Sequence, residues 1–190
     1  MTLLNIVLIE NDLNSTLLEY GLKGAGFKCL KTQHSSQFLE VVKKTAPDAV
    51  IFNLDTPSEK ITADLHHLSQ HFPLPVIMFA TDITVEAINQ VIKAGVSELI
   101  VNGLENNLPS IIHIAIARFN QQQVLKHALE EARVQLEDRK QIDRAKAILI
   151  KTRNFTENEA YHTLRKLAMD RSITLGEMAK NVIAMAELLK

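Results

Sequence analysis

Four short apolar runs, each followed directly by a polar loop, limit what the N-terminal half of the chain can fold into. They lie at residues 6–9, 49–52, 76–79 and 99–101. Each run is too short for a helix, and its lack of polar alternation is typical of a parallel strand that is covered on both faces. We expect a further, weaker strand at residues 27–30.

Helical stretches separate these runs. Each has apolar residues at three- and four-residue spacing and ends close to a glycine or proline, namely Gly26, Pro47, Pro73 or Gly95. Strands that alternate with helices build a parallel sheet through right-handed crossovers. The pattern predicts an α/β fold with a doubly wound five-stranded parallel sheet, whose ligand chemistry belongs in the loops after the carboxyl ends of the strands.

From about residue 108 onward the strand pattern stops. No proline or glycine occurs between Pro109 and Gly176, which permits one extended helix and more. A seam of apolar residues follows it at three- and four-residue spacing, interrupted by Gln122. Its members are Ile112, Ala115, Phe119, Leu125, Leu129, Ala132 and Leu136. We favour a short coiled coil between two copies of the chain, and the alternative is a helix that packs on its own domain.

Three helical segments follow the seam and predict a small all-α unit. The first covers about residues 136–152, the second begins at a capping box of Thr156 and Glu159, and the third follows Thr174. The residues expected to face inward repeat at helical spacing. They are Ile142, Ala145 and Leu149, then Ala160, Leu164 and Leu167, then Leu175, Met178, Val182, Met185 and Leu189.

Composition excludes several classes of protein. With 21 Lys+Arg against 22 Asp+Glu, the whole chain has no general attraction for nucleic acid, so such a function needs a local basic patch. Cys29 is the only cysteine, which excludes an intrachain disulfide and a cysteine-based metal site. No apolar run approaches the roughly 20 residues that span a bilayer, and the first residues lack the features of a signal peptide. We therefore expect a cytoplasmic protein with no membrane segment.

Polar loops follow the first and second strong runs, at residues 6–9 and 49–52. One carries Glu10, Asn11 and Asp12, and the other carries Asn53 and Asp55. With these loops, residues 4–120 resemble the receiver domain of two-component response regulators. Further marks of the resemblance are Gly26, Phe27, Pro47, Pro57, Pro75, Ala94 and Gly95.

The phosphorylation site that this resemblance implies is degenerate. Asn11 replaces one acid after the first strand, and Asn53 stands at the phosphoacceptor position, where its amide is not a nucleophile. Ala80 replaces the hydroxyl residue, and Asn102 replaces the lysine after the last strand. We expect a pseudo-receiver whose degenerate site consists of Glu10, Asn11, Asp12, Asn53, Ala80 and Asn102. Phosphotransfer through Asp12 or Asp55 is a weaker alternative, because neither occupies the acceptor position.

Metal binding is not expected, and no cofactor is required. Glu10, Asp12 and Asp55 offer oxygen ligands for Mg²⁺, but an octahedral site is hard to fix without the missing aspartates, so solvated loop carboxylates are favoured. His67 and His71 are one helical turn apart and close to His66, but no third ligand has compelling spacing. We interpret them as surface histidines.

The C-terminal segments resemble the ANTAR domain over about residues 136–183. The matching motifs are Ile-Asp-Arg-Ala-Lys at residues 142–146, Glu-Ala-Tyr at 159–161 and Ala-Met-Asp at 168–170. Ala147 and Asn154 stand where the family often has glycine. The resemblance implies an RNA-binding module for transcription antitermination.

Basic residues of these helices are the candidate RNA contacts. Lys140, Arg144 and Lys151 fall within about 40° of one another on a helical wheel, opposite the expected buried face. On the next helix Tyr161 precedes Arg165 by one turn, so an aromatic ring that can stack on a base lies beside a guanidinium, and Lys166 adds charge. The alternative is a solvated helix face with Tyr161 half-buried in the core.

The whole chain resembles short antitermination regulators, most closely the nitrate type and also the amidase type. We divide it into a receiver-like domain at residues 1–120, a coiled-coil linker at 121–135 and an ANTAR RNA-binding domain at 136–190. The resemblance implies a non-enzymatic homodimer that binds RNA stem-loops in a leader transcript and is controlled by a ligand-sensing partner protein. The alternatives are a DNA-binding response regulator and an adaptor that binds only proteins.

Overall fold

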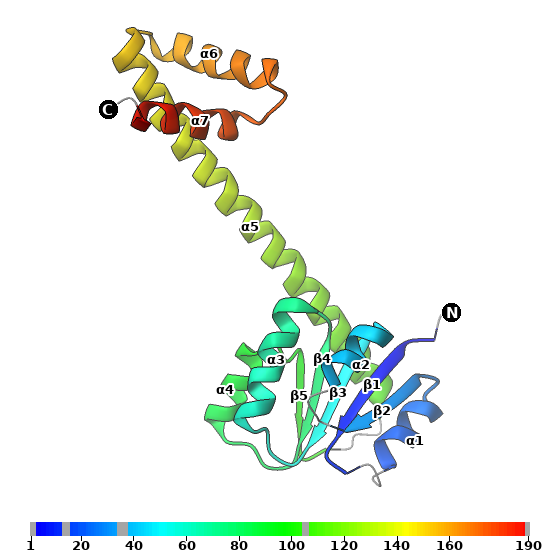
Figure 1. Cartoon of the computed structure of the whole chain (residues 1–190). Coiled ribbons are helices and arrows are strands. Elements are labelled where there is room, and N and C mark those ends of the chain that lie inside the picture. Colours follow the sequence, from blue (N-terminus) through cyan, green and yellow to red (C-terminus); the bar gives the residue numbers. More distant parts are fainter. Residues whose placement is uncertain (1–2, 13–15, 34–37, 104–106, 189–190) are drawn as a thin grey trace. The chain divides into compact units, whose positions relative to one another are not determined.

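The computed structural model describes residues 3–12, 16–33, 38–103 and 107–188, and the chain divides into two compact units. The first unit is Met1–Gln123 and the second is Val124–Lys190. A long helix, α5 (Leu108–Arg153), contributes its first turns to the first unit and its remaining turns to the second (Figure 1).

The first unit is built on a five-stranded parallel sheet, as predicted. The strand order is β2-β1-β3-β4-β5, the flavodoxin-like order of a doubly wound sheet. The strands are β1 (Asn5–Glu10), β2 (Lys28–Gln33), β3 (Ala49–Leu54), β4 (Val76–Ala80) and β5 (Glu98–Val101). Strand β2 continues three residues beyond the predicted end, through Lys31, Thr32 and Gln33. These residues are polar because β2 lies at the sheet edge, where burial on both faces is not required.

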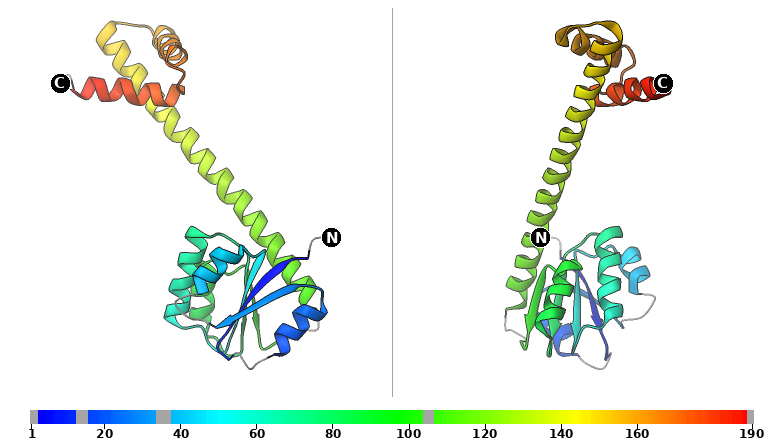
Figure 2. Two further views of the ribbon diagram at one scale, coloured as in Figure 1. Left: turned by 45° about the vertical axis from the view of Figure 1, so that its right-hand side comes forward. Right: turned by 90° about the vertical axis from the view of Figure 1, so that its left-hand side faces the viewer.

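Helices cover both faces of this sheet (Figure 2). Helices α2 (Phe38–Thr45), α3 (Glu59–His71) and α4 (Val85–Lys93) pack on one face, and α1 (Leu17–Gly24) and the start of α5 pack on the other. Leu18 and Leu22 of α1 and Ile112 and Ala115 of α5 are at most 1% exposed. The first part of the predicted apolar seam therefore packs on its own domain.

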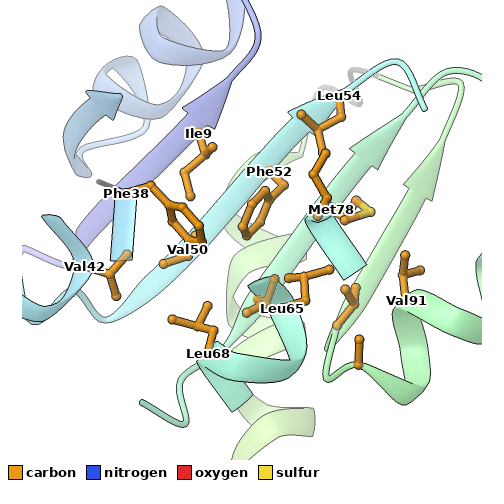
Figure 3. Close-up of a cluster of buried hydrophobic side chains, with 14 of the residues drawn as sticks. Ile9, Phe38, Val42, Val50, Phe52, Leu54, Leu65, Leu68, Met78 and Val91 are labelled. Atoms are coloured by element: carbon orange, nitrogen blue, oxygen red, sulfur yellow. The ribbon is translucent and has the colours of Figure 1, made fainter. Parts of the chain in front are cut away.

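The core under α2–α4 fixes the sheet on that side (Figure 3). Phe38 of α2 meets Phe52 of β3 edge-to-face, with ring centroids 5.9 Å apart, a favoured aromatic geometry. Ile9, Phe52 and Met78 come from three neighbouring strands and are fully buried. The parallel pairing of β1 with β3 places Glu10 opposite Asn53 at the carboxyl ends of the two strands.

The second unit consists of the end of α5, α6 (Glu157–Asp170) and α7 (Leu175–Leu188). The predicted linker and first C-terminal helix form one continuous helix. The predicted capping box is confirmed: Thr156 accepts a hydrogen bond from the Glu159 amide, and Glu159 accepts one from the Thr156 amide. Asn154 has a φ of 54°, the left-handed conformation that ends a helix.

The predicted inward face of α7 is partly wrong. Met178 is buried as expected, but Met185 is 59% exposed, and Leu189 lies outside the described residues. Leu175 and Val182 are half-buried and pack against the core of the unit as predicted, and Gly176, Ala179 and Ile183 are buried in addition. The contact face is rotated toward small residues because Gly176 lies against the Asp138 side chain of α5, where a Cβ atom would collide with the carboxyl group.

Candidate functional site

A pocket of about 160 Å³ lies at the carboxyl ends of β1 and β3, where the sequence places the degenerate phosphorylation site. It brings together most of the predicted residues. They are Glu10, Asn11, Asp12 and Asn53, and the other lining residues are Leu54, Asp55 and Thr81. Ala80 is buried at the end of β4, and the Asn102 backbone amide donates to the Ala80 carbonyl oxygen at 3.0 Å. Neither residue is among those that line the pocket.

Glu10 is the buried acid of this pocket, and both of its carboxylate oxygens are engaged. The Asn53 side-chain amide donates to Oε1 at 2.6 Å, and the Lys31 ammonium pairs with Oε2 at 2.8 Å. The Glu10 side chain is 2% exposed and the Lys31 side chain 10%. A buried carboxylate is stable only when it is paired and hydrogen-bonded, and here an amide and an ammonium meet that need.

The other pocket carboxylates do not complete a cation site. The Thr81 hydroxyl donates to Asp55 at 3.3 Å, and the backbone amides of Thr81 and Asp82 donate to the Asp55 carbonyl oxygen. Across the residues that the structure describes, no group of three or more His, Cys, Asp or Glu side chains is arranged to hold a metal ion. The donor set does not fit Mg²⁺, because the best-placed acid is already neutralised by a lysine.

The paired histidines and the cysteine of the first unit show no sign of a reactive role. The rings of His67 and His71 stack with centroids 4.2 Å apart, and His71 Nδ1 lies 3.0 Å from the His67 carbonyl oxygen. Burial raises the pKa of the Cys29 thiol to about 11, so the thiol is protonated and a poor nucleophile at neutral pH.

The predicted basic stripe on α5 lies on the exposed face of the helix. Lys140, Arg144 and Lys151 are exposed, whereas Ala145, on the opposite face, is fully buried. Arg144 pairs with Glu187 of α7, with Nη2 and Oε1 2.8 Å apart. Among the described residues, no carboxylate lies within ion-pair distance of Lys140 or Lys151.

A neighbouring lysine of α5 has a structural role. Lys146 pairs with Asp143 at 2.8 Å and with Glu157 of α6 at 2.9 Å, and its side chain is 17% exposed. Hydrogen bonds to both carboxylates raise the Lys146 pKa, Asp143 having the larger effect. Lys146 thus joins the end of α5 to the start of α6.

Helix α6 presents a mixed aromatic, basic and apolar stripe. Tyr161 is 39% exposed, and Arg165, one turn later, is exposed, as is Lys166. The next turn adds Met169, which is 70% exposed and which was not among the predicted site residues. The His162 ring also meets Tyr161 edge-on with centroids 6.0 Å apart. The sequence alone could have indicated Met169 and His162. Met169 lies four residues after Arg165, on the same face of the helix, and His162 follows Tyr161 directly.

The later part of the apolar seam is left uncovered in the described part of the second unit. Leu125, Leu129 and Leu136 are 61–63% exposed, although each is an aliphatic side chain. These residues and Ala132 repeat at alternating four- and three-residue spacing, which is the spacing of a coiled-coil interface.

A known domain family matches the C-terminal part of the chain. The sequence model of the ANTAR domain matches residues 130–183, which covers the end of α5, all of α6 and most of α7. The chain thus combines a receiver-like fold with a C-terminal segment that matches the ANTAR domain.

A curated relative is similar over nearly the whole chain. The transcriptional regulatory protein PdtaR of Mycobacterium tuberculosis H37Rv is 24% identical over 177 residues, which cover 93% of this chain and 84% of that protein. Among the helices that the structure describes, none is both long and apolar enough to cross a membrane.

Solved structures resemble the first unit. The receiver domain of a modulated diguanylate cyclase from Desulfovibrio desulfuricans G20 has a TM-score of 0.56 at 15% identity, over 64% of this chain and 99% of that one. The receiver domain of a LuxO repressor protein from Vibrio parahaemolyticus has a TM-score of 0.55 at 14% identity, over 65% and 98%. At these identities the likeness shows the fold alone.

Proposed function

We propose that this chain is a cytoplasmic transcription antitermination regulator that binds stem-loops in a nascent leader transcript and prevents a terminator from forming. The observation that carries the proposal is the α6 stripe, in which Tyr161, Arg165 and Lys166 are all exposed within the ANTAR segment. An exposed ring beside a guanidinium suits the stacking and hydrogen bonding of unpaired loop bases.

The basic stripe on α5 supplies the second part of the interface. Lys140, Arg144 and Lys151 form a row of positive charge suited to RNA phosphates, which contribute most of the affinity of such complexes. Phosphates position the RNA, whereas contacts to unpaired bases specify it. We assign the first role to α5 and the second to α6.

The exposed seam of α5 supports a dimer. Leu125, Leu129 and Leu136 would bury their aliphatic side chains against a second copy, and paired ANTAR domains would then engage two adjacent stem-loops. This arrangement resembles the nitrate type of regulator.

Control is proposed to come from a ligand-sensing partner protein and not from phosphorylation. Asn53 stands at the acceptor position and donates its amide to Glu10, so the residue is occupied as a hydrogen-bond donor and offers no nucleophile. The pseudo-receiver would then serve as a docking domain.

A titration of fluorescent RNA that carries two adjacent stem-loops tests RNA binding. Wild type is compared, at several salt concentrations and without a phosphodonor, with the triple alanine variant of Lys140, Arg144 and Lys151. The matched control replaces Lys43, Lys44 and Lys93 of the first unit, which removes the same charge. We expect only the stripe variant to lose affinity, with a salt slope shallower by about two at roughly 0.7 per phosphate contact.

Two outcomes would contradict the proposal. Equal displacement of the RNA by duplex DNA would favour a DNA-binding regulator, and absence of any salt-dependent nucleic-acid binding would favour a protein adaptor. Acyl phosphate on the chain after exposure to a small phosphodonor would contradict the proposed mode of control.

A further inference from the structure

Three carboxylate side chains line the pocket at the carboxyl edge of the sheet, although they are not grouped closely enough to form a metal site among the described residues. Glu10, Asp12 and Asp55 line one pocket, and carboxylate oxygens are the ligands that Mg²⁺ prefers in proteins. Of the three, Glu10 is buried, and a buried carboxylate needs a compensating charge or hydrogen bonds. The structure indicates where that charge comes from.

Strand β2 supplies that charge from the sheet edge. β2 is parallel to β1, and the register places Lys31 opposite Leu8, two residues before Glu10, so both side chains project from the same face of the sheet. The Lys31 ammonium lies 2.8 Å from Glu10 Oε2, and both side chains are nearly buried. Two residues further along β2, Gln33 donates to the Asn11 carbonyl oxygen at 3.1 Å. Two side chains of β2 thus hold the loop after β1.

The opposite side of Glu10 is held by β3. Asn53 is the direct neighbour of Glu10 in the register, and its amide donates to Oε1 at 2.6 Å. An aspartate at this position would add a second negative charge, whereas the amide adds a donor. The replacement at residue 53 and the lysine at residue 31 therefore act in the same direction, because both stabilise the ionised Glu10 without a metal ion.

We propose that Lys31 is the permanent counter-ion of this pocket and excludes divalent cations from it. A bound Mg²⁺ would have to displace an ammonium that is already desolvated and paired with Glu10, and it would leave that ammonium buried beside a dication. The pocket is consequently held in one charge state whatever the Mg²⁺ concentration. This inference concerns the first unit alone and does not depend on RNA binding.

Isothermal titration of the full chain with MgCl₂ tests the proposal, with thermal unfolding in MgCl₂ or EDTA at matched ionic strength as a second readout. The test variant is Lys31→Met, which keeps the length of the side chain and removes its charge. The control is Lys28→Met, an exposed lysine at the other end of the same strand. Lys31→Arg keeps the positive charge at the pocket.

We expect no Mg²⁺ binding and no Mg²⁺-dependent change in Tm for wild type, Lys28→Met and Lys31→Arg. Lys31→Met should bind Mg²⁺ at least about tenfold more tightly than wild type and should gain a Mg²⁺-dependent rise in Tm, since a ligand of the native state stabilises it. If Lys31→Met does not fold without a metal ion, Lys31→Gln replaces it in the same comparison. Wild type that binds Mg²⁺ as tightly as Lys31→Met would overturn the proposal. Failure of every variant to bind would also overturn it, because Lys31 would then not be what excludes the cation.

Discussion

Arg144 of α5 and Glu187 of α7 form an ion pair in which Nη2 and Oε1 are 2.8 Å apart and both side chains are more than half exposed. The pair ties a cation of the proposed RNA interface to a carboxylate of the same unit. An RNA phosphate that binds Arg144 must compete with Glu187 for it. If the proposed interface binds RNA, the second unit carries a weak competitor for it in Glu187.

Glu187→Gln should tighten RNA binding. Exposed ion pairs contribute between about 0 and 1 kcal/mol, so the gain is at most about fivefold in Kd. The measurement is the stem-loop titration of the proposed interface. Glu187→Asp keeps the charge and should bind as wild type does. Glu187→Gln in the Arg144→Ala background should give no gain in RNA affinity. An equal gain in that background would show that Glu187 acts through general electrostatic repulsion of the RNA and not through Arg144.

Removing only one partner of the buried ion pair between Lys31 and Glu10 should lower the free energy of unfolding strongly. Lys31→Met leaves the Glu10 carboxylate uncompensated at 2% exposure, and removing one partner of a buried pair costs about 3–5 kcal/mol. Glu10→Gln in the same chain should recover part of that loss, because it removes the stranded charge. Denaturant unfolding of the two single variants and the double variant measures the coupling. Additive losses would mean that the two side chains do not interact.

The sequence carries enough information for the sheet but not for this pair. The four apolar runs match β1, β3, β4 and β5. Strands β1, β3 and β4 are buried almost throughout, which is why their sequences show no polar alternation, whereas β5 is only partly buried. Strand β2 was predicted too short because its second half is polar. Lys31 then fell outside the predicted strand, and its proximity to Glu10 depends on the pairing of β2 with β1, which no local pattern records.

The buried faces of the C-terminal helices could also be predicted only in part. The wheel of α5 placed Ala145 inside and Lys140 outside correctly, because its apolar side chains are large and regularly spaced. The wheel of α7 failed at Met185, which is exposed, whereas the small residues Gly176 and Ala179 are buried and Gly176 lies directly against Asp138. Small residues carry no hydrophobic signal that a periodicity can detect.

Gly176→Ala should destabilise the second unit. A Cβ atom at residue 176 would collide with the Asp138 carboxyl group, so α7 must move or Asp138 must give up its position 3.6 Å from Lys180. Overpacking of this kind costs about 1–3 kcal/mol. The higher helix propensity of alanine offsets part of this loss. Gly24→Ala is the control, because a Cβ atom added at residue 24 would meet nothing within 4 Å. Thermal unfolding should show a loss at residue 176 only, and Asp138→Ala should rescue it.

Glu159 should make α6 sensitive to acid. Hydrogen bonds from the Thr156 backbone amide, and then from its hydroxyl, lower the Glu159 pKa. A carboxylate with a lowered folded-state pKa contributes stability above its unfolded-state pKa of about 4.3, and this stability is lost as the pH falls through the folded-state value. The difference in unfolding free energy between wild type and Glu159→Gln should therefore shrink in that acidic range and stay constant near neutrality. A difference that does not vary with pH would contradict the capping role of the charge.

Leu129 gives the sharpest test of the dimer, because it lies in the middle of the exposed part of the seam and is 62% exposed in the single chain. Leu129→Lys places a charge at a core position of the proposed coiled coil, where like charges from two copies would face each other. The single chain already leaves this side chain in water, so its own unfolding free energy should change by less than about 0.5 kcal/mol. Sedimentation equilibrium should then report monomers for Leu129→Lys and dimers for wild type. The control is Glu130→Lys, which makes an even larger change of charge one residue away, off the seam, and should leave the dimer intact. Equal molecular masses for wild type and Leu129→Lys would show that the seam does not join two copies.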